Sequence, residues 1–132
     1  MARFDSVDEF LNTPENSRFK WGENDCALFA NNMLVQVYDF EDVGEKFRGK
    51  YKTPLGAARR VFKLGYKSVA DIPQTHLKCI PTAKKGCIAL HPTIDALGVC
   101  NGEYSYFLKE HHGLERVENK NCRKFWGIEC QQ

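Results

Sequence analysis

The chain has 132 residues and a mass of 15.2 kDa, which is enough for one domain, so we predict a single domain over residues 1–132. Hydrophobic residues make up 42% and charged residues 27%, and nine Phe, five Tyr and two Trp argue against a disordered chain. No apolar run approaches the ~18 residues of a membrane span, so we expect no membrane insertion. Asp5 precedes any apolar stretch, which is atypical of a secretory signal and predicts synthesis in a cytoplasm.

The net charge of +2 conceals a strong segregation. Residues 1–45 hold ten acidic and three basic residues, a net charge of −7, whereas residues 46–85 hold eleven basic residues and one acidic residue, a net charge of +10. Such asymmetry predicts either two faces that meet within the molecule or a basic surface that meets an acidic protein partner. No nucleic-acid-binding motif accompanies the basic residues, so nucleic acid is the less favoured partner.

The six cysteines do not define a disulfide framework or a metal site. In a reducing compartment the expected state is free thiol. The chain has no Cys-x-x-Cys pair and no zinc-type spacing of Cys and His, so we expect no metal and no cofactor. The spacing alone does not name a disulfide pair among Cys26, Cys79, Cys87, Cys100, Cys122 and Cys130.

Helices are expected in the first part of the chain, residues 1–85. Ser6 is a suitable N-cap for a short helix over residues 7–11, which Pro14 ends. Asn24 or Asp25 is the predicted N-cap of a buried helix that runs to residue 38 and holds Cys26 in its first turn.

A third helix is predicted after Thr53 as N-cap, with a C-terminal stop at Gly65. Its expected buried face consists of Leu55, Ala58, Val61, Phe62 and Leu64. Residues 66–85 show no clear period and are predicted to be loop with a short turn of helix.

From residue 86 the pattern changes to short strand-like runs over residues 87–91, 96–100, 104–108, 114–117 and 125–128, with a helical turn predicted over residues 121–124. Helices followed by a run of antiparallel strands predict an α+β fold, with a helical part over about 1–85 packed on a sheet over about 86–132.

Cys26 is the one thiol whose predicted position suits chemistry. The positive end of a helix favours thiolate over thiol, as in the nucleophile of papain-like enzymes, which also need a histidine and a group to orient it. The alternative is that Cys26 is only the first buried residue of a core helix. Asp25, beside Cys26 at the predicted helix start, is predicted to be an N-cap and not a catalytic acid, because aspartate is a preferred residue at that position.

The segment from Phe19 to Ala30, with Trp21-Gly22 and Asp25-Cys26 at its centre, resembles the Trp-Gly…Asp-Cys segment of NlpC-type cell-wall cysteine peptidases. It is still more similar to a compact group of phage and prophage tail proteins related to those peptidases. The further segments that carry the resemblance are Phe47–Tyr51, Gly56–Arg59, Gly86–Leu90, Ala96–Gly102, Gly113–Leu114 and Cys122–Trp126. The resemblance covers almost the whole chain and implies a papain-like NlpC-type fold.

The chain departs from the peptidases at the expected base. Their catalytic histidine opens a strand in a His-x-Gly pattern, and with Gly98 as anchor that position is Ala96. An alanine cannot accept the proton of a thiol. The third, polar position of the resemblance falls near Tyr106, an unusual orienter for an imidazole.

His91 is the candidate replacement base. Only four residues separate it from Ala96, so a four-residue hairpin loop would place the two residues opposite each other on one side of the sheet. A register shift of one residue would turn His91 away. His111 and His112 are expected to be solvated, and His76 to be exposed or to bond locally.

Three functions from different classes follow. The favoured one, implied by the resemblance, is a component of the phage tail tip or baseplate with a degenerate peptidase centre, present in the virion and bound to tail-hub proteins. The second is an active cysteine peptidase or amidase that cleaves peptidoglycan during DNA delivery, with Cys26 as nucleophile and His91 as base. The third is a tail protein that binds nucleic acid through the basic residues 46–85.

Overall fold

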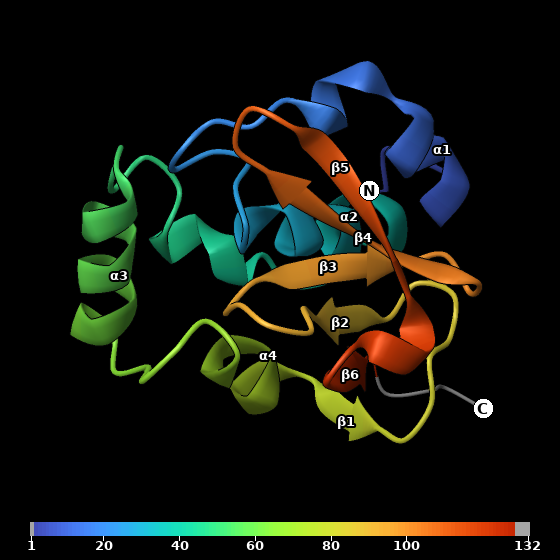
Figure 1. Ribbon diagram of the computed structural model, residues 1–132. Coiled ribbons are helices and arrows are strands. Elements are labelled where there is room, and N and C mark those ends of the chain that lie inside the picture. The colour runs from blue at the N-terminus through green and yellow to red at the C-terminus, as the bar shows by residue number, and fades with distance from the viewer. Residues whose placement is uncertain (1, 129–132) are drawn as a thin grey trace.

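The computed structural model describes residues 2–128, which form an α+β fold with one antiparallel sheet (Figure 1). The α-helices are α1 (Val7–Asn12), α2 (Leu28–Tyr38), α3 (Pro54–Lys63) and α4 (Asp71–His76). Three short 3-10 helices cover Pro14–Ser17, Val43–Lys46 and Asn119–Asn121. The strands are β1 (Lys78–Ile80), β2 (Ile88–Leu90), β3 (Leu97–Cys100), β4 (Tyr104–Lys109), β5 (Gly113–Glu118) and β6 (Lys124–Gly127). In the sheet their order is β1-β6-β2-β3-β4-β5.

The predicted N-caps of α1 and α3 are confirmed. Ser6 Oγ accepts a hydrogen bond from the N–H of Glu9 at 3.1 Å, and Thr53 Oγ1 accepts one from the N–H of Gly56 at 3.0 Å. Gly65 follows α3 with φ of 96°, a left-handed conformation that glycine adopts without a steric cost. Local capping chemistry therefore sets these helix ends.

The predicted buried face of α3 is correct for Val61 and Leu64 and wrong for Leu55, Ala58 and Phe62, which are exposed. Leu55 and Phe62 are 60% and 79% exposed, and the helix buries Val61, with Ala57 and Leu64 partly buried. Both apolar sets repeat at helical spacing, and α3 turns Ala57, Val61 and Leu64 towards the cluster that contains Tyr51.

One strand was missed, and the helical turn is displaced. β1 lies in the segment predicted to be loop and pairs with β6, with Cys79 opposite Trp126. The turn predicted over residues 121–124 forms at Asn119–Asn121. The hairpin of β2 and β3 has the predicted register, since Leu90 pairs with Leu97 and the N–H of His91 donates to the carbonyl of Ala96 at 3.0 Å.

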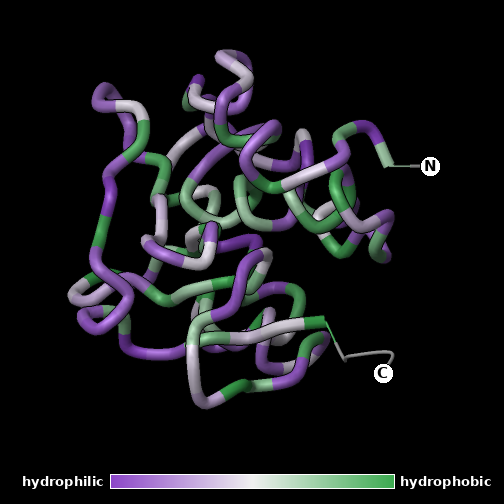
Figure 2. Tube along the Cα trace, turned by 90° about the vertical axis from the view of Figure 1, so that its right-hand side faces the viewer, coloured by the Kyte–Doolittle hydropathy of each residue, from purple (hydrophilic) through white to green (hydrophobic). Residues whose placement is uncertain are grey.

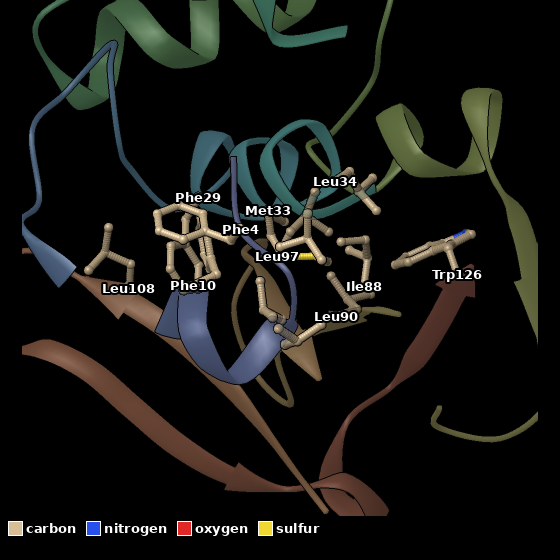
Figure 3. Close-up of a cluster of buried hydrophobic side chains, with 14 residues drawn as sticks. Phe4, Phe10, Phe29, Met33, Leu34, Ile88, Leu90, Leu97, Leu108 and Trp126 are labelled. Atoms are coloured by element: carbon tan, nitrogen blue, oxygen red, sulfur yellow. The ribbon is translucent and has the colours of Figure 1, made fainter. Parts of the chain in front are cut away.

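The main core lies between α1, α2 and one face of the sheet. Figure 3 shows this cluster extending from Leu108 at one end to Trp126 at the other, with Phe10, Phe29 and Met33 between them. Each of these five side chains is at most 2% exposed. Alternate residues of β2 and β3 supply the sheet side of the core, so the residues between them project from the opposite face.

Hydrophobic and hydrophilic residues are interspersed along the coloured part of the trace (Figure 2). Over residues 2–128, no helix is long and apolar enough to cross a membrane.

Candidate functional site

The turn that precedes α2 is built on a buried carboxylate. Asp25 is 1% exposed, and its Oδ1 accepts hydrogen bonds from the N–H groups of Ala27 at 3.1 Å and Leu28 at 3.0 Å. Its Oδ2 accepts from the N–H of Gly22 at 3.0 Å and from the hydroxyl of Tyr51 at 2.7 Å. Four donors compensate for burial of the charge, so Asp25 is the predicted cap and also fixes the approach of the chain to the helix.

Cys26 follows this anchor, but it lies in the turn before α2 and not in its first helical turn. The helix begins at Leu28, after Ala27 at the N-cap position, and the Asp25 side chain accepts from the N–H of Leu28, one of the first N–H groups that have no acceptor within the helix. The carbonyl of Cys26 accepts a hydrogen bond from the N–H of Leu97 at 2.8 Å, which holds the start of β3 against the cysteine. Ala96, the position where the resemblance implies a histidine, is therefore next to the residue that bonds Cys26.

The half-buried Cys26 faces a cleft of about 210 Å³. Trp21, Tyr51 and Val61 contribute to the wall on the side of α3, and Asp95 contributes a carboxylate. Asp95 is already occupied, because it accepts hydrogen bonds from the N–H groups of Val69 at 2.7 Å and Ala70 at 3.1 Å. The cleft thus presents a thiol among apolar walls and a carboxylate bound to backbone.

This environment favours the neutral thiol. Burial, and next the negative charge of Asp25, raise the pKa of Cys26 to about 12. The expected lowering at a helix start is wrong here, since a backbone hydrogen bond acts in that direction but is outweighed. At neutral pH Cys26 is therefore held as the neutral thiol, whereas a nucleophile needs the thiolate.

His91 is engaged elsewhere. Its Nδ1 accepts hydrogen bonds from the N–H of Thr93 at 3.1 Å and, more weakly, from Ile94 at 3.4 Å. Those donors assign the ring proton to Nε2, which lies 2.9 Å from Glu115 Oε1. The ring also meets Phe107 edge to face, at 4.9 Å between centroids. Nε2 donates to Glu115 and the lone pair on Nδ1 accepts backbone N–H groups, so the ring has no free lone pair for the proton of a thiol.

The two candidate catalytic residues are not joined. Within residues 2–128 no hydrogen bond connects Cys26 Sγ to His91, and Cys26 has no histidine among the causes of its raised pKa. His91 follows Leu90, a core residue, so strand alternation directs it to the face of the sheet opposite α2. The hairpin brings His91 beside Ala96 as predicted, but the imidazole turns to β5.

The other histidines lie where the sequence predicts. His111 and His112 are exposed, and His76 Nε2 lies 2.8 Å from the hydroxyl of Tyr66. Tyr106, the third position of the resemblance, pairs with Val99 across β3 and β4. Of the residues that the structure describes, no group of three His, Cys, Asp or Glu is arranged to hold a metal ion.

Sequence reasoning missed two residues of this region, Tyr51 and Glu115. Tyr51 is 26 positions from Asp25, and Glu115 is 24 positions from His91, so neither contact has a local signal. A buried tyrosine needs a hydrogen-bond partner for its hydroxyl, and this general requirement was the one signal that could have pointed to a polar partner for Tyr51. Burial, together with the charge and hydrogen bond of Asp25, raises the pKa of Tyr51, so its hydroxyl remains a donor.

Residues 3–128 match a family described as a domain of unknown function, DUF6950. The chain belongs to this family. No curated protein and no solved structure matches it. The family match covers nearly the whole chain.

Proposed function

We propose that this DUF6950 protein is a structural component of a phage tail tip or baseplate, with a papain-like NlpC-type fold whose peptidase centre no longer hydrolyses. The observation that supports it best is that Cys26 has a raised pKa and no hydrogen bond to a histidine among the described residues. Ala96, where the resemblance implies a catalytic histidine, precedes Leu97, whose N–H bonds the carbonyl of Cys26. The segment around Trp21 and Cys26 supplies the resemblance to tail proteins. A thiol without a base supports a scaffold in preference to an enzyme.

The outer face of α3 supports a role in assembly. Leu55 and Phe62 are separated by seven residues, or two helical turns, and both are exposed. The exposed Arg59 lies between them, and Lys63 follows Phe62. α3 stands at the edge of the molecule, away from α1 (Figure 1). Two apolar anchors bordered by cations fit an apolar groove with an acidic rim on a neighbouring tail protein.

Co-expression with the tail-hub proteins of the same phage tests the proposal. We expect a complex that survives size-exclusion chromatography and that Phe62→Ser weakens at least tenfold. Cys26→Ala is expected to leave the complex intact, because assembly does not use the thiol. Lys120→Ser, at an exposed position after β5, is the control for a surface change far from α3 in the sequence. A chain that remains monomeric beside every hub protein contradicts the proposal.

Two further assays on the same protein test the two alternative functions. Cleavage of muropeptides that is lost in both Cys26→Ala and His91→Ala would establish the peptidase. Binding of DNA with a steep loss of affinity as salt rises would establish the nucleic-acid reading. Under the proposal the chain shows neither activity.

A further inference from the structure

Two cysteines, Cys87 and Cys100, lie on the face of the sheet that is turned away from α2, and Cys122 is within electrostatic range of both. Cys87 and Cys100 lie next to Ile88 and Val99 in the chain, and those two side chains belong to the main core. Strand alternation therefore directs both cysteines to the opposite face. Cys87 and Cys100 are 2% and 0% exposed.

Backbone hydrogen bonds fix Cys87 and Cys100 opposite each other. The N–H of Cys100 donates to the carbonyl of Cys87 at 3.0 Å, and the N–H of Gly86 donates to the carbonyl of Cys100 at 2.8 Å. Gly86 has φ of 88°, so Gly86 and Cys87 together face Cys100 in a glycine bulge. Directly opposed residues of antiparallel strands have Cα atoms about 4.5–5.5 Å apart, within the range that a disulfide spans.

The two sulfurs also interact with each other and with nearby donors. Hydrogen bonding between the thiols raises the pKa of Cys87 and lowers the pKa of Cys100. The N–H of Gly102 donates to Cys100 Sγ at 3.3 Å, and the N–H of Lys84 donates to Cys87 Sγ at 3.4 Å. Cys100 is thus the better nucleophile of the pair, because its sulfur accepts hydrogen bonds that favour the thiolate.

Cys122 connects this buried pair to the surface. It is half-buried, and it follows the 3-10 helix whose Asn119 Oδ1 lies 3.7 Å from Cys100 Sγ. The same oxygen accepts a hydrogen bond from Ser105 Oγ at 2.7 Å. Burial, and to a smaller extent a charge on Cys100, raises the pKa of Cys122, and Cys122 is also within electrostatic range of Cys87. The three thiols therefore form one electrostatic cluster, with Cys122 as its accessible member.

We propose that this cluster is a thiol–disulfide exchange site in which Cys122 reacts first with a small disulfide and Cys87 and Cys100 form the final bond. The Cys122 thiolate attacks one sulfur of the small disulfide and releases one small thiol. Cys100 then attacks the Cys122 sulfur of this mixed disulfide, which releases the second small thiol and forms the Cys100–Cys122 bond. Cys87 finally attacks Cys100 and releases Cys122 as thiol. One small disulfide is reduced to two thiols, and the Cys87 and Cys100 thiols are oxidised to one disulfide.

The test treats the reduced, folded chain with oxidised glutathione and maps the disulfides by mass spectrometry at intervals. We expect a peptide pair joined through Cys87 and Cys100 within one chain, preceded by glutathione on Cys122. A final product joined through Cys100 and Cys122, or bonds dominated by Cys26, Cys79 or Cys130, would overturn the pairing. Cys130 lies outside the described residues.

Single substitutions test the route. Cys122→Ser is expected to slow formation of the Cys87–Cys100 bond at least tenfold, because the two remaining sulfurs are buried. Cys79→Ser, at an exposed position on β1, is the matched control and is expected to change nothing. An unchanged rate in Cys122→Ser overturns the role of that thiol.

The oxidised chain is expected to unfold at a higher urea concentration than the reduced chain, and a lower midpoint contradicts a bond that fits the native sheet. These outcomes do not depend on the tail proposal.

Discussion

At the scale of single residues, Asp25 holds four hydrogen bonds through one buried carboxylate. Its carboxylate joins three segments: the turn at Gly22, the start of α2 at Leu28, and the chain at Tyr51. All the hydrogen bonds observed for this carboxylate hold the backbone and Tyr51 in place. The residue next to the thiol therefore maintains the shape of the cleft and also keeps Cys26 protonated.

Asp25→Asn is expected to lower the free energy of unfolding by about 2–4 kcal/mol, because an amide nitrogen would face N–H donors and leave them without an acceptor. Urea denaturation followed by tryptophan fluorescence measures the change. Asp5→Asn, at an exposed position, is the matched control and is expected to stay within about 0.5 kcal/mol. Equal effects of the two substitutions would show that the buried bonds of Asp25 contribute nothing.

The raised pKa of Cys26 predicts its reactivity. Alkylation by iodoacetamide in the folded protein is expected to keep accelerating up to pH about 12, well beyond the plateau of an ordinary thiol near 8.5. Because the folded-state pKa exceeds the unfolded one, this thiol favours folding at low pH, and its contribution is lost as pH rises from about 9 towards 12. Mass spectrometry of Cys26 peptides, with Cys79 as the exposed reference, measures the profile.

The same profile in His91→Ala decides whether the imidazole acts on the thiol. We expect no change, since the ring bonds Glu115 and the backbone of Thr93. Rapid alkylation of Cys26 at neutral pH that slows in His91→Ala would reveal a thiolate–imidazolium pair. That result would favour the active peptidase over the structural tail protein.

At the scale of elements, β3 and β4 approach each other through a glycine. A Cβ at Gly98 would lie 2.6 Å from Phe107 Cε2 and 2.6 Å from the carbonyl oxygen of Tyr106. The absence of a side chain lets the Phe107 ring cover the strand and contact His91 from there. The glycine that anchors the family resemblance thus has a packing role in this chain.

Gly98→Ala is therefore expected to cost about 2–4 kcal/mol of unfolding free energy, because backbone as well as a ring must shift. Gly127→Ala is the matched control: it also lies in a strand, and its Cβ would be 3.5 Å from Ile80, an ordinary contact. Thermal and urea unfolding of both variants measure the difference. A Gly98→Ala protein as stable as Gly127→Ala would contradict the close approach.

The sequence anticipates elements where local chemistry decides them and misses those that depend on distant partners. Caps at Ser6 and Thr53 are local signals, and a four-residue loop was enough to predict the pairing of His91 with Ala96. β1 has only three residues and is a strand because β6, far along the chain, bonds it. The partner of His91 likewise depends on the pairing of β4 with β5.

For the whole molecule, the segregated charges are only partly neutralised by the fold. Between the acidic first third and the basic segment 46–85, the ion pairs observed in residues 2–128 are Asp8 with Lys85 at 2.7 Å and Asp42 with Arg48 at 2.9 Å. The hydrogen bond to Arg48 lowers the pKa of Asp42. The Asp42–Arg48 pair is partly buried. Most basic residues of the segment are exposed, and α3 presents several of them beside its apolar side chains. This distribution favours an acidic partner over a purely intramolecular role.

Binding of the proposed tail partner should then depend on these charges and on salt. The double substitution Arg59→Glu and Lys63→Glu on α3 is expected to weaken the complex at least tenfold, and raising the salt from 50 to 300 mM should weaken the unmodified complex in the same direction. Lys120→Glu with Lys124→Glu makes the same change of net charge outside the basic segment and is expected to have a small effect. Titration by calorimetry measures all three. If both double variants lose affinity equally, net charge and not the α3 surface governs association; if neither does and salt has no effect, the partner does not bind through charge at all.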